Sequence, residues 1–253
     1  MKSSIFKICL FLSIALLFGC STGDGSRVVI VTNQGSIELQ LYEKTPEHTA
    51  NFIKLAREGY YDGLLFHKVI KEFIIQGGDT EGSSFTIPAE IVPEYIHKRG
   101  ALAAYRLEDQ FNPSRASSGT QFYIVHGKVY SDYELDQVEI QIAEGYARDM
   151  YYQYYKEEEA VMLQSELAIN LDSVDLRATR RASAWLLENP YKMRAEAREI
   201  YKTVGGFPLL DGEYTVFGEV IKGFEVINKI AEFETDYADR PKIDVKIRRI
   251  RMK

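Results

Sequence analysis

Short apolar runs that alternate with polar positions recur in two parts of the chain, residues 28–125 and 208–253. Such alternation is typical of strands that place one face against a core. Val28–Thr32 and Ser36–Tyr42 are joined by a tight turn at Asn33-Gln34-Gly35. Further strands are predicted at Leu65–Ile70, Phe73–Gln76, Ala101–Ala104, Phe122–Val125, Tyr214–Val220 and Asp244–Met252. Many short strands with few helices favour a closed antiparallel β-barrel.

Two helices are expected within these parts. Thr45-Pro46 supplies an N-cap residue followed by proline at the first helical position, and Gly59 marks the end of this helix. Gly223–Phe233 has the apolar spacing of a second helix. The last strand needs a bulge to keep four apolar residues on one face, Val245, Ile247, Ile250 and Met252.

Residues 126–207 break the strand pattern and predict an all-helical insertion. A capping box at Ser131–Glu134 begins the first helix, and a turn at Asn170-Leu171-Asp172 follows it. A second helix is expected from about Val174 to Glu188, and Asn189-Pro190 is expected to begin a third. The helical face of the first helix is apolar at Leu135, Val138, Ile142, Tyr146 and Met150.

The charges of the insertion are sorted along the chain. Residues 131–175 hold twelve acidic and two basic residues, a balance of −10, whereas residues 176–202 hold seven basic and three acidic residues, a balance of +4. A hairpin would bring the opposite charges together. The alternative is two separately solvated faces, because surface ion pairs each contribute only about 0–1 kcal/mol. The turn and cap signals favour the hairpin.

The N-terminal residues read as an export signal. Lys2 and Lys7 precede an apolar run from Ile8 to Phe18 that is short for a membrane span. Leu17-Phe18-Gly19-Cys20 resembles a bacterial lipoprotein cleavage site, and the alternative is an ordinary secretory signal with an incidental cysteine. We expect a signal peptide at residues 1–19, lipid on Cys20 and a flexible tether at residues 20–27.

The net charge limits the classes of binding partner, and the cysteine content limits the possible disulfide bonds. The net charge of −6 becomes −8 without the two lysines of residues 1–19, which argues against nucleic acid as a partner. Cys9 and Cys20 are the two cysteines, so the mature chain is expected to hold no disulfide.

The expected location is the cell envelope, with Cys20 anchored in the outer membrane because Ser21 is not an acidic retention signal. Which face of that membrane carries the protein stays open.

Several blocks of residues together resemble the cyclophilin family of peptidyl-prolyl isomerases. They occur in the family's order in residues 28–125 and 208–253 and leave residues 126–207 uncovered. The blocks are Asn51-Phe52-Ile53, Gly59-Tyr60-Tyr61-Asp62-Gly63, Phe66-His67-Lys68-Val69-Ile70, Phe73-Ile74-Ile75-Gln76-Gly77-Gly78-Asp79, Gly100-Ala101-Leu102-Ala103, Gln121-Phe122-Tyr123-Ile124 and Leu210-Asp211-Gly212-Glu213-Tyr214-Thr215-Val216-Phe217-Gly218.

The resemblance implies a mainly β fold, a closed eight-stranded antiparallel barrel with two capping helices, here interrupted by the helical insertion. It also implies catalysis of cis–trans rotation about X-Pro bonds. Lys68 falls at the position of the family's catalytic arginine, and Gln76 and Gln121 would orient it and the substrate backbone. The implied proline site consists of Phe73, Ile74, Phe122, Tyr123 and Leu210, with Tyr214 at a position where many relatives carry histidine.

Amide rotation has a barrier of about 18–20 kcal/mol and needs an apolar slot for the ring and a donor to the twisted amide. No metal or organic cofactor is expected, and the partners are proline-containing polypeptides. Lys68 lacks the planar fork of arginine, so activity is expected to be reduced. The alternative is a proline-binding scaffold whose insertion recruits a protein partner. The tyrosines between Tyr146 and Tyr155 either form such a binding surface or pack within the insertion.

Overall fold

A computed structural model describes residues 26–80, 85–164 and 170–253. The predicted signal peptide, Cys20 and most of the tether lie outside these residues. Eight antiparallel strands form one sheet in the order β10-β1-β2-β9-β6-β8-β4-β3. They are β1 (Arg27–Thr32), β2 (Ser36–Leu41), β3 (Phe66–Val69), β4 (Ile74–Gly78), β6 (Ala101–Ala104), β8 (Gln121–Val125), β9 (Val216–Lys222) and β10 (Ile247–Met252).

The two edges of this sheet meet, which closes the barrel. The backbone N–H of Phe66 donates to the carbonyl of Val245 over 2.9 Å, and the N–H of Ile247 donates to the carbonyl of Leu64 over 2.8 Å. The predicted closed barrel is therefore confirmed. The sequence pattern did not indicate a small second sheet formed by β5 (Thr86–Ile87) and β7 (Ser117–Ser118), which are too short to show periodicity.

The bulge predicted in the last strand is present. Val31 pairs with Arg249 and Thr32 with Ile247, so Arg248 is the extra residue of β10. This offset keeps Ile247 and Ile250 in the core, where at most 4% of either residue is exposed.

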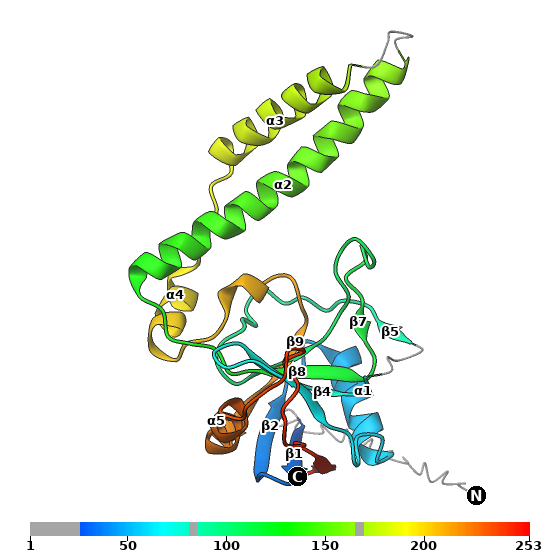
Figure 1. Cartoon of the computed structure of the whole chain (residues 1–253), viewed down its shortest axis with the longest axis vertical. Helices are drawn as coiled ribbons and strands as arrows, with labels where there is room; N and C mark the ends of the chain where they lie inside the picture. The colour runs from blue at the N-terminus through cyan, green and yellow to red at the C-terminus, as the bar shows by residue number, and fades with distance from the viewer. Residues whose placement is uncertain (1–25, 81–84, 165–169) are drawn as a thin grey trace, which may run out of the picture.

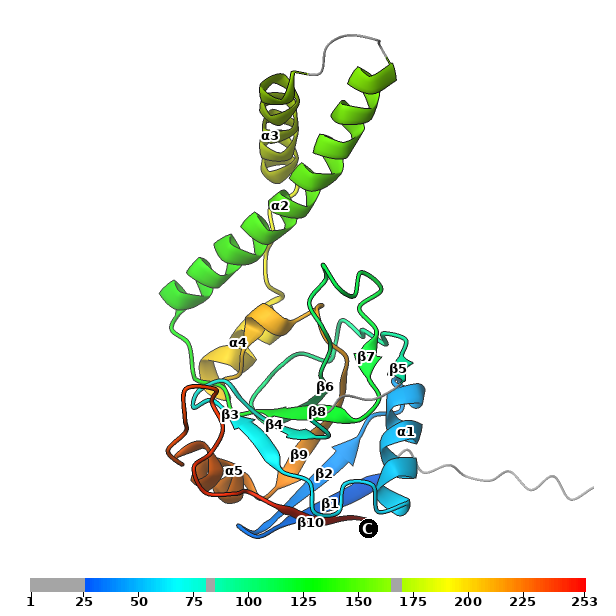
Figure 2. The ribbon, with the colours of Figure 1, turned by 45° about the vertical axis from the view of Figure 1, so that its right-hand side comes forward.

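Helices α1 (Pro46–Arg57) and α5 (Phe224–Ala231) lie on opposite sides of the barrel (Figure 2). Thr45 occupies the N-cap position of α1, but its side chain makes no capping hydrogen bond. The Glu90 carboxylate accepts the backbone N–H groups of Glu47 and His48 instead, at 3.1 and 3.0 Å. An acidic group from a distant loop thus caps the positive end of α1.

The insertion projects from the barrel as a helical hairpin (Figure 1). We call its two long helices, α2 (Asp132–Gln164) and α3 (Leu171–Glu188), the arm. Arg181 pairs with Glu157 at 2.7 Å and with Glu158 at 3.0 Å, and Arg177 pairs with Glu158 at 3.1 Å. The predicted hairpin of opposite charges is therefore confirmed.

The predicted caps of the insertion had mixed outcomes. At the start of α2, Ser131 and Glu134 form the expected capping box, in which the Ser131 N–H donates to the Glu134 carboxylate over 2.8 Å. Asn189, however, ends α3, because its N–H donates to the Trp185 carbonyl. The prediction that Asn189-Pro190 begins the third helix is wrong. Residues 190–194 form a connection before α4 (Ala195–Thr203), whose first turn lacks that proline.

A buried junction cluster ties the base of the insertion to the barrel. It joins Ile96 of the barrel to Leu135 and Val138 of α2 and to Ala197 and Tyr201 of α4, and also contains Tyr130, Met193 and, partly buried, Leu209. The two ends of the insertion meet at Gly127 and Gly206. A Cβ atom on Gly127 would lie 2.5 Å from the Gly206 Cα atom, so glycine permits this approach.

Candidate active site

An apolar cluster covers the outer face of β4, β6, β8 and β9. Its buried members include Ile74 and Tyr123, and Phe73, Leu210 and Tyr214 pack against them while staying partly exposed. The rings of Tyr123 and Tyr214 lie edge to face with centroids 5.9 Å apart. Phe73 packs on Phe207 with centroids 4.4 Å apart. Five of the six predicted apolar site residues therefore lie together, and we call this set the outer cluster.

Phe122 is the exception, because it points into the barrel. Successive side chains of a strand alternate between its faces, so Phe122 lies opposite its neighbour Tyr123. Its ring packs edge to face against Phe52, Tyr61 and Phe66, with centroids 5.4, 5.5 and 5.9 Å apart. Phe122 is 1% exposed within the main core. The prediction that Phe122 lines the proline site is therefore corrected. Phe122 packs in the barrel core, on the face of β8 opposite the outer cluster.

A row of polar residues borders the outer cluster. Strand register places Lys68 of β3 opposite Gln76 of β4, and Gln76 opposite Tyr123 of β8. The Gln76 side-chain amide donates to the Gln121 side-chain oxygen over 3.0 Å. The Lys68 ammonium lies 3.6 Å from the Asp239 carboxylate, and about 40% of each side chain is exposed. The predicted cation and both glutamines thus stand beside the apolar residues.

A buried hydrogen-bond chain runs beneath the outer cluster. The Tyr123 hydroxyl lies 3.0 Å from His97 Nε2, and His97 Nδ1 lies 3.0 Å from Asp211 Oδ1. The second Asp211 oxygen accepts the Tyr201 hydroxyl over 2.7 Å. Burial raises the pKa of both Tyr123 and Tyr201 well above the usual range, so both phenols stay protonated donors. Sequence reasoning missed His97 and Tyr201, because neither lies in a motif with recognisable spacing.

A buried arginine holds the other side of the outer cluster. The Arg106 guanidinium lies 4.7 Å from the centre of the Tyr214 ring and donates to the carbonyl of Glu213 over 2.6 Å. It also pairs with the Glu213 carboxylate at 3.0 Å and with Asp109. Arg115 pairs with the same two acids. These bonds fasten the loop 107–119 to the segment that carries Tyr214.

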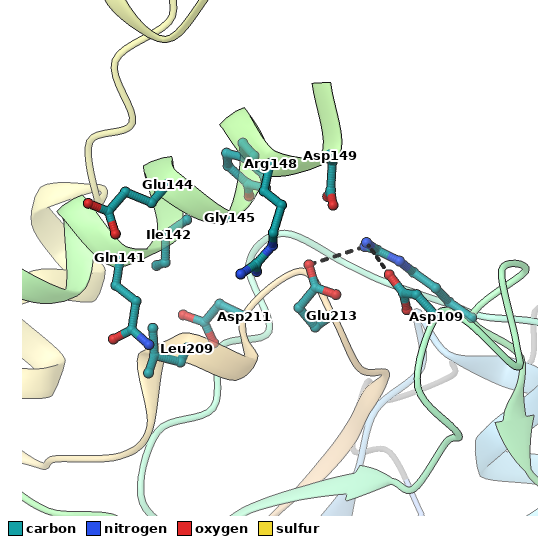
Figure 3. A pocket seen from close by; sticks show the side chains of 12 residues that line it. Asp109, Gln141, Ile142, Glu144, Gly145, Arg148, Asp149, Leu209, Asp211 and Glu213 are labelled. Atoms are coloured by element: carbon teal, nitrogen blue, oxygen red, sulfur yellow. Dashed lines mark hydrogen bonds and ion pairs between the residues drawn. The ribbon is translucent and has the colours of Figure 1, made fainter. Parts of the chain in front are cut away.

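Helix α2 faces the segment 209–213 across a cleft of about 480 Å³ (Figure 3). Leu209, Asp211 and Glu213 form the barrel side, and Arg148 points from α2 towards the two acids. Because Leu210 and Tyr214 belong to the same segment, the cleft adjoins the outer cluster. A bound chain that leaves the outer cluster on this side would pass along α2.

The described residues offer no metal centre and no membrane span. Within residues 26–80, 85–164 and 170–253, no three His, Cys, Asp or Glu side chains are arranged to hold a metal ion. In the same part of the chain, no helix combines the length and apolar character needed to cross a membrane.

Sequence comparison decides the family. Residues 27–145 and 195–252 match the family described as cyclophilin type peptidyl-prolyl cis-trans isomerase/CLD. The chain belongs to this family. It is therefore a cyclophilin-type peptidyl-prolyl isomerase, and residues 146–194, which hold most of the arm, lie outside the matched ranges.

Individual relatives agree with this family. The chain is 30% identical over 239 residues to a bifunctional phosphatase/peptidyl-prolyl cis-trans isomerase of Streptococcus pyogenes, covering 89% of this chain but 38% of that protein. It is 25% identical to human peptidyl-prolyl cis-trans isomerase-like 1, covering 87% of this chain and 88% of that one. A Cryptosporidium parvum cyclophilin, solved in the presence of the dipeptide Ala-Pro, shares the fold with a TM-score of 0.54, 24% identity and coverage of 90% and 98%.

Proposed function

We propose that this cyclophilin isomerises X-Pro bonds of exported proteins in the cell envelope, held at the outer membrane by lipid on Cys20. One observation carries the catalytic part: the register that sets Lys68, Gln76 and Tyr123 side by side on three strands, next to a partly exposed apolar cluster. An apolar surface for a proline ring thus lies beside a partly exposed cation.

The outer cluster would hold the proline ring through Phe73, Ile74 and Leu210, over the Tyr123 ring. The Lys68 ammonium would donate to the prolyl nitrogen, whose lone pair becomes available only when the amide twists. Such a bond stabilises the transition state more than either planar isomer, which is the requirement for a rate increase. The paired Gln76 and Gln121 side chains would fix the substrate backbone.

Lys68 must leave Asp239 to reach a substrate. An ion pair 3.6 Å long with both partners about 40% exposed is weak in water, so the cost of leaving it is small. The loss relative to arginine is larger, since one charge-assisted hydrogen bond is worth about 1.5–3 kcal/mol, or roughly 10- to 150-fold in rate. We therefore expect turnover below that of an arginine-containing cyclophilin.

A second candidate function is proline binding without turnover, with the arm recruiting a partner. The observation that favours it is the arm surface, where Tyr152, Val161 and Leu176 are each more than half exposed. A protease-coupled assay with short X-Pro peptides separates the two candidates. Turnover by the full chain supports the isomerase, and peptide binding without turnover supports the scaffold.

The anchor rests on Leu17-Phe18-Gly19-Cys20 and needs its own test. The Cys20→Ala protein should be released from membranes or accumulate unprocessed, because thioether attachment of the lipid needs the Cys20 sulfur. Intact-mass analysis of the membrane-extracted wild type should show acyl chains on Cys20. An unmodified mature protein in the soluble fraction would rule out the anchor and leave the isomerase proposal standing.

A further inference from the structure

We infer that Tyr201, which the insertion contributes, is a positioning residue for the proline site and acts through Asp211 and His97 on Tyr123. The inference rests on the proposed isomerase function. It makes the base of the insertion a working part of the active site and leaves the distal arm free for another role.

Each donor in this chain of hydrogen bonds has an acceptor. With a proton on Nδ1, His97 donates to Asp211 Oδ1, and its Nε2 accepts the Tyr123 hydroxyl. The backbone N–H of His97 donates to the same Asp211 oxygen over 2.7 Å. Tyr201 donates to the other oxygen over 2.7 Å. Both oxygens of Asp211 are therefore engaged, one by the barrel and one by the insertion.

The residues joined by these hydrogen bonds are buried or mostly buried. His97 and Tyr201 are fully buried, and Tyr123 is 2% exposed. Asp211 is about 18% exposed in its side chain, on the side of the cleft beneath α2. In a buried setting, an oxygen that loses its donor has little water to replace it, so each bond restricts the position of its neighbour.

The position of Asp211 matters because of its neighbours. Leu210 precedes it and Tyr214 follows three residues later, and both belong to the outer cluster. His97 carries the constraint to the Tyr123 ring, the buried base of that cluster. Tyr201 therefore acts on both walls of the proline site without touching a substrate.

The first test compares Tyr201→Phe with a matched control, Tyr130→Phe. Tyr130 belongs to the same junction cluster and packs edge to face on Tyr201 with centroids 6.3 Å apart. Within the described part of the chain, the Tyr130 hydroxyl makes no hydrogen bond. Tyr201→Phe should lower kcat/KM about fivefold, the typical weight of one hydrogen bond, mainly by raising KM. Tyr130→Phe should leave both constants unchanged.

The second test is a double-mutant cycle that a merely structural role would not satisfy. In a Tyr123→Phe background the far end of the chain is already cut, so Tyr201→Phe should cost clearly less than in the wild type. Equal kcat/KM in wild type and Tyr201→Phe, or fully additive losses in the cycle, would overturn the inference. The thermal transition of each variant checks that it is folded.

Peptide affinity keeps this inference distinct from the proposed function. If the full-length wild type has no turnover, the isomerase proposal fails, and the Kd for an Ala-Ala-Pro-Phe peptide replaces kcat/KM. Tyr201→Phe should then weaken binding about fivefold while Tyr130→Phe does not. Wild-type turnover with equal affinity and kcat/KM in both variants would retain the isomerase and remove the role of Tyr201.

Discussion

Lys68 lies on β3, at the end of the polar row, and its ammonium pairs with Asp239. In the proposed mechanism the ammonium binds a peptide instead. Lys68→Ala should lower kcat roughly 10- to 150-fold with little change in KM, because in the proposed mechanism the Lys68 ammonium donates to the twisted amide while the outer cluster binds the proline ring. Lys71 offers a matched control, since it is also exposed and pairs with Glu232 at 2.8 Å. Lys71→Ala should leave kcat unchanged in the peptide assay.

The reverse substitution sharpens this prediction. Lys68→Arg restores a planar fork of donors and should raise kcat above the wild-type value. Equal rates for wild type and Lys68→Ala would exclude the ammonium as the catalytic donor. An inactive wild type that Lys68→Arg does not rescue would favour the proline-binding scaffold.

The sequence motifs contain most of the residues that the structure brings together at the candidate site, while the catalytic and binding roles of these residues stay predictions. The motifs identified Lys68, Gln76 and Tyr123, and strand register set them side by side. Phe122 was misplaced because a motif gives no weight to the two faces of a strand. Tyr201 was not found, because its role comes from α4 packing against a segment that begins only after the insertion.

At the scale of elements, the first turn of α2 depends on an acid whose charge can be titrated. The hydrogen bond from Lys128, at 2.7 Å, and those from the Ser131 N–H and hydroxyl lower the pKa of Glu134 to about 2. Since the folded pKa lies below the ordinary value of 4.5, the stabilisation is fully present above pH 4.5. It is lost as the pH falls towards 2.

Glu134→Gln should therefore lower the unfolding temperature at pH 7, and the difference from wild type should shrink between pH 4.5 and pH 2. Glutamine keeps one acceptor for the Ser131 N–H but loses the charge that attracts Lys128. Glu144→Gln, an exposed acid on the same helix, serves as control and should have no effect at pH 7. A difference that stays constant across this pH range would show that the charge is not responsible.

Element boundaries were predicted correctly where residues close in sequence determine them. Ala101–Ala104 and the capping box at Ser131 and Glu134 were predicted as they occur. The cap of α1 was not foreseen, because the carboxylate comes from Glu90 on a distant loop. Asn189-Pro190 has the composition of a helix start, yet Asn189 is the C-cap residue of α3.

At the scale of the molecule, the arm and its base should behave differently when removed. The rings of Tyr146 and Tyr191 lie 6.0 Å apart, so a short Gly/Ser loop can replace residues 147–190 between them. This variant keeps α4 and the junction cluster, and it should retain a cooperative thermal transition and isomerase activity. A pull-down partner lost with it would assign recruitment to the arm.

Replacing residues 128–205 should be far more damaging. It removes Leu135 and Tyr201, both fully buried, and exposes Ile96 and Leu209. Each large buried side chain contributes about 1.5–3 kcal/mol to the free energy of unfolding, so the loss should be visible as a markedly lower unfolding temperature. Similar unfolding temperatures for the two deletions would show that the base adds nothing to the fold.

The pairing of β1 with β10 joins the two ends of the described chain, since Val28 lies opposite Met252. The barrel thus cannot close until β10 has been synthesised, whereas the arm needs only contacts between adjacent helices and can form within microseconds. Trp185 of α3 is the single tryptophan and reports on the arm alone. In refolding, its fluorescence should reach the native value before isomerase activity returns.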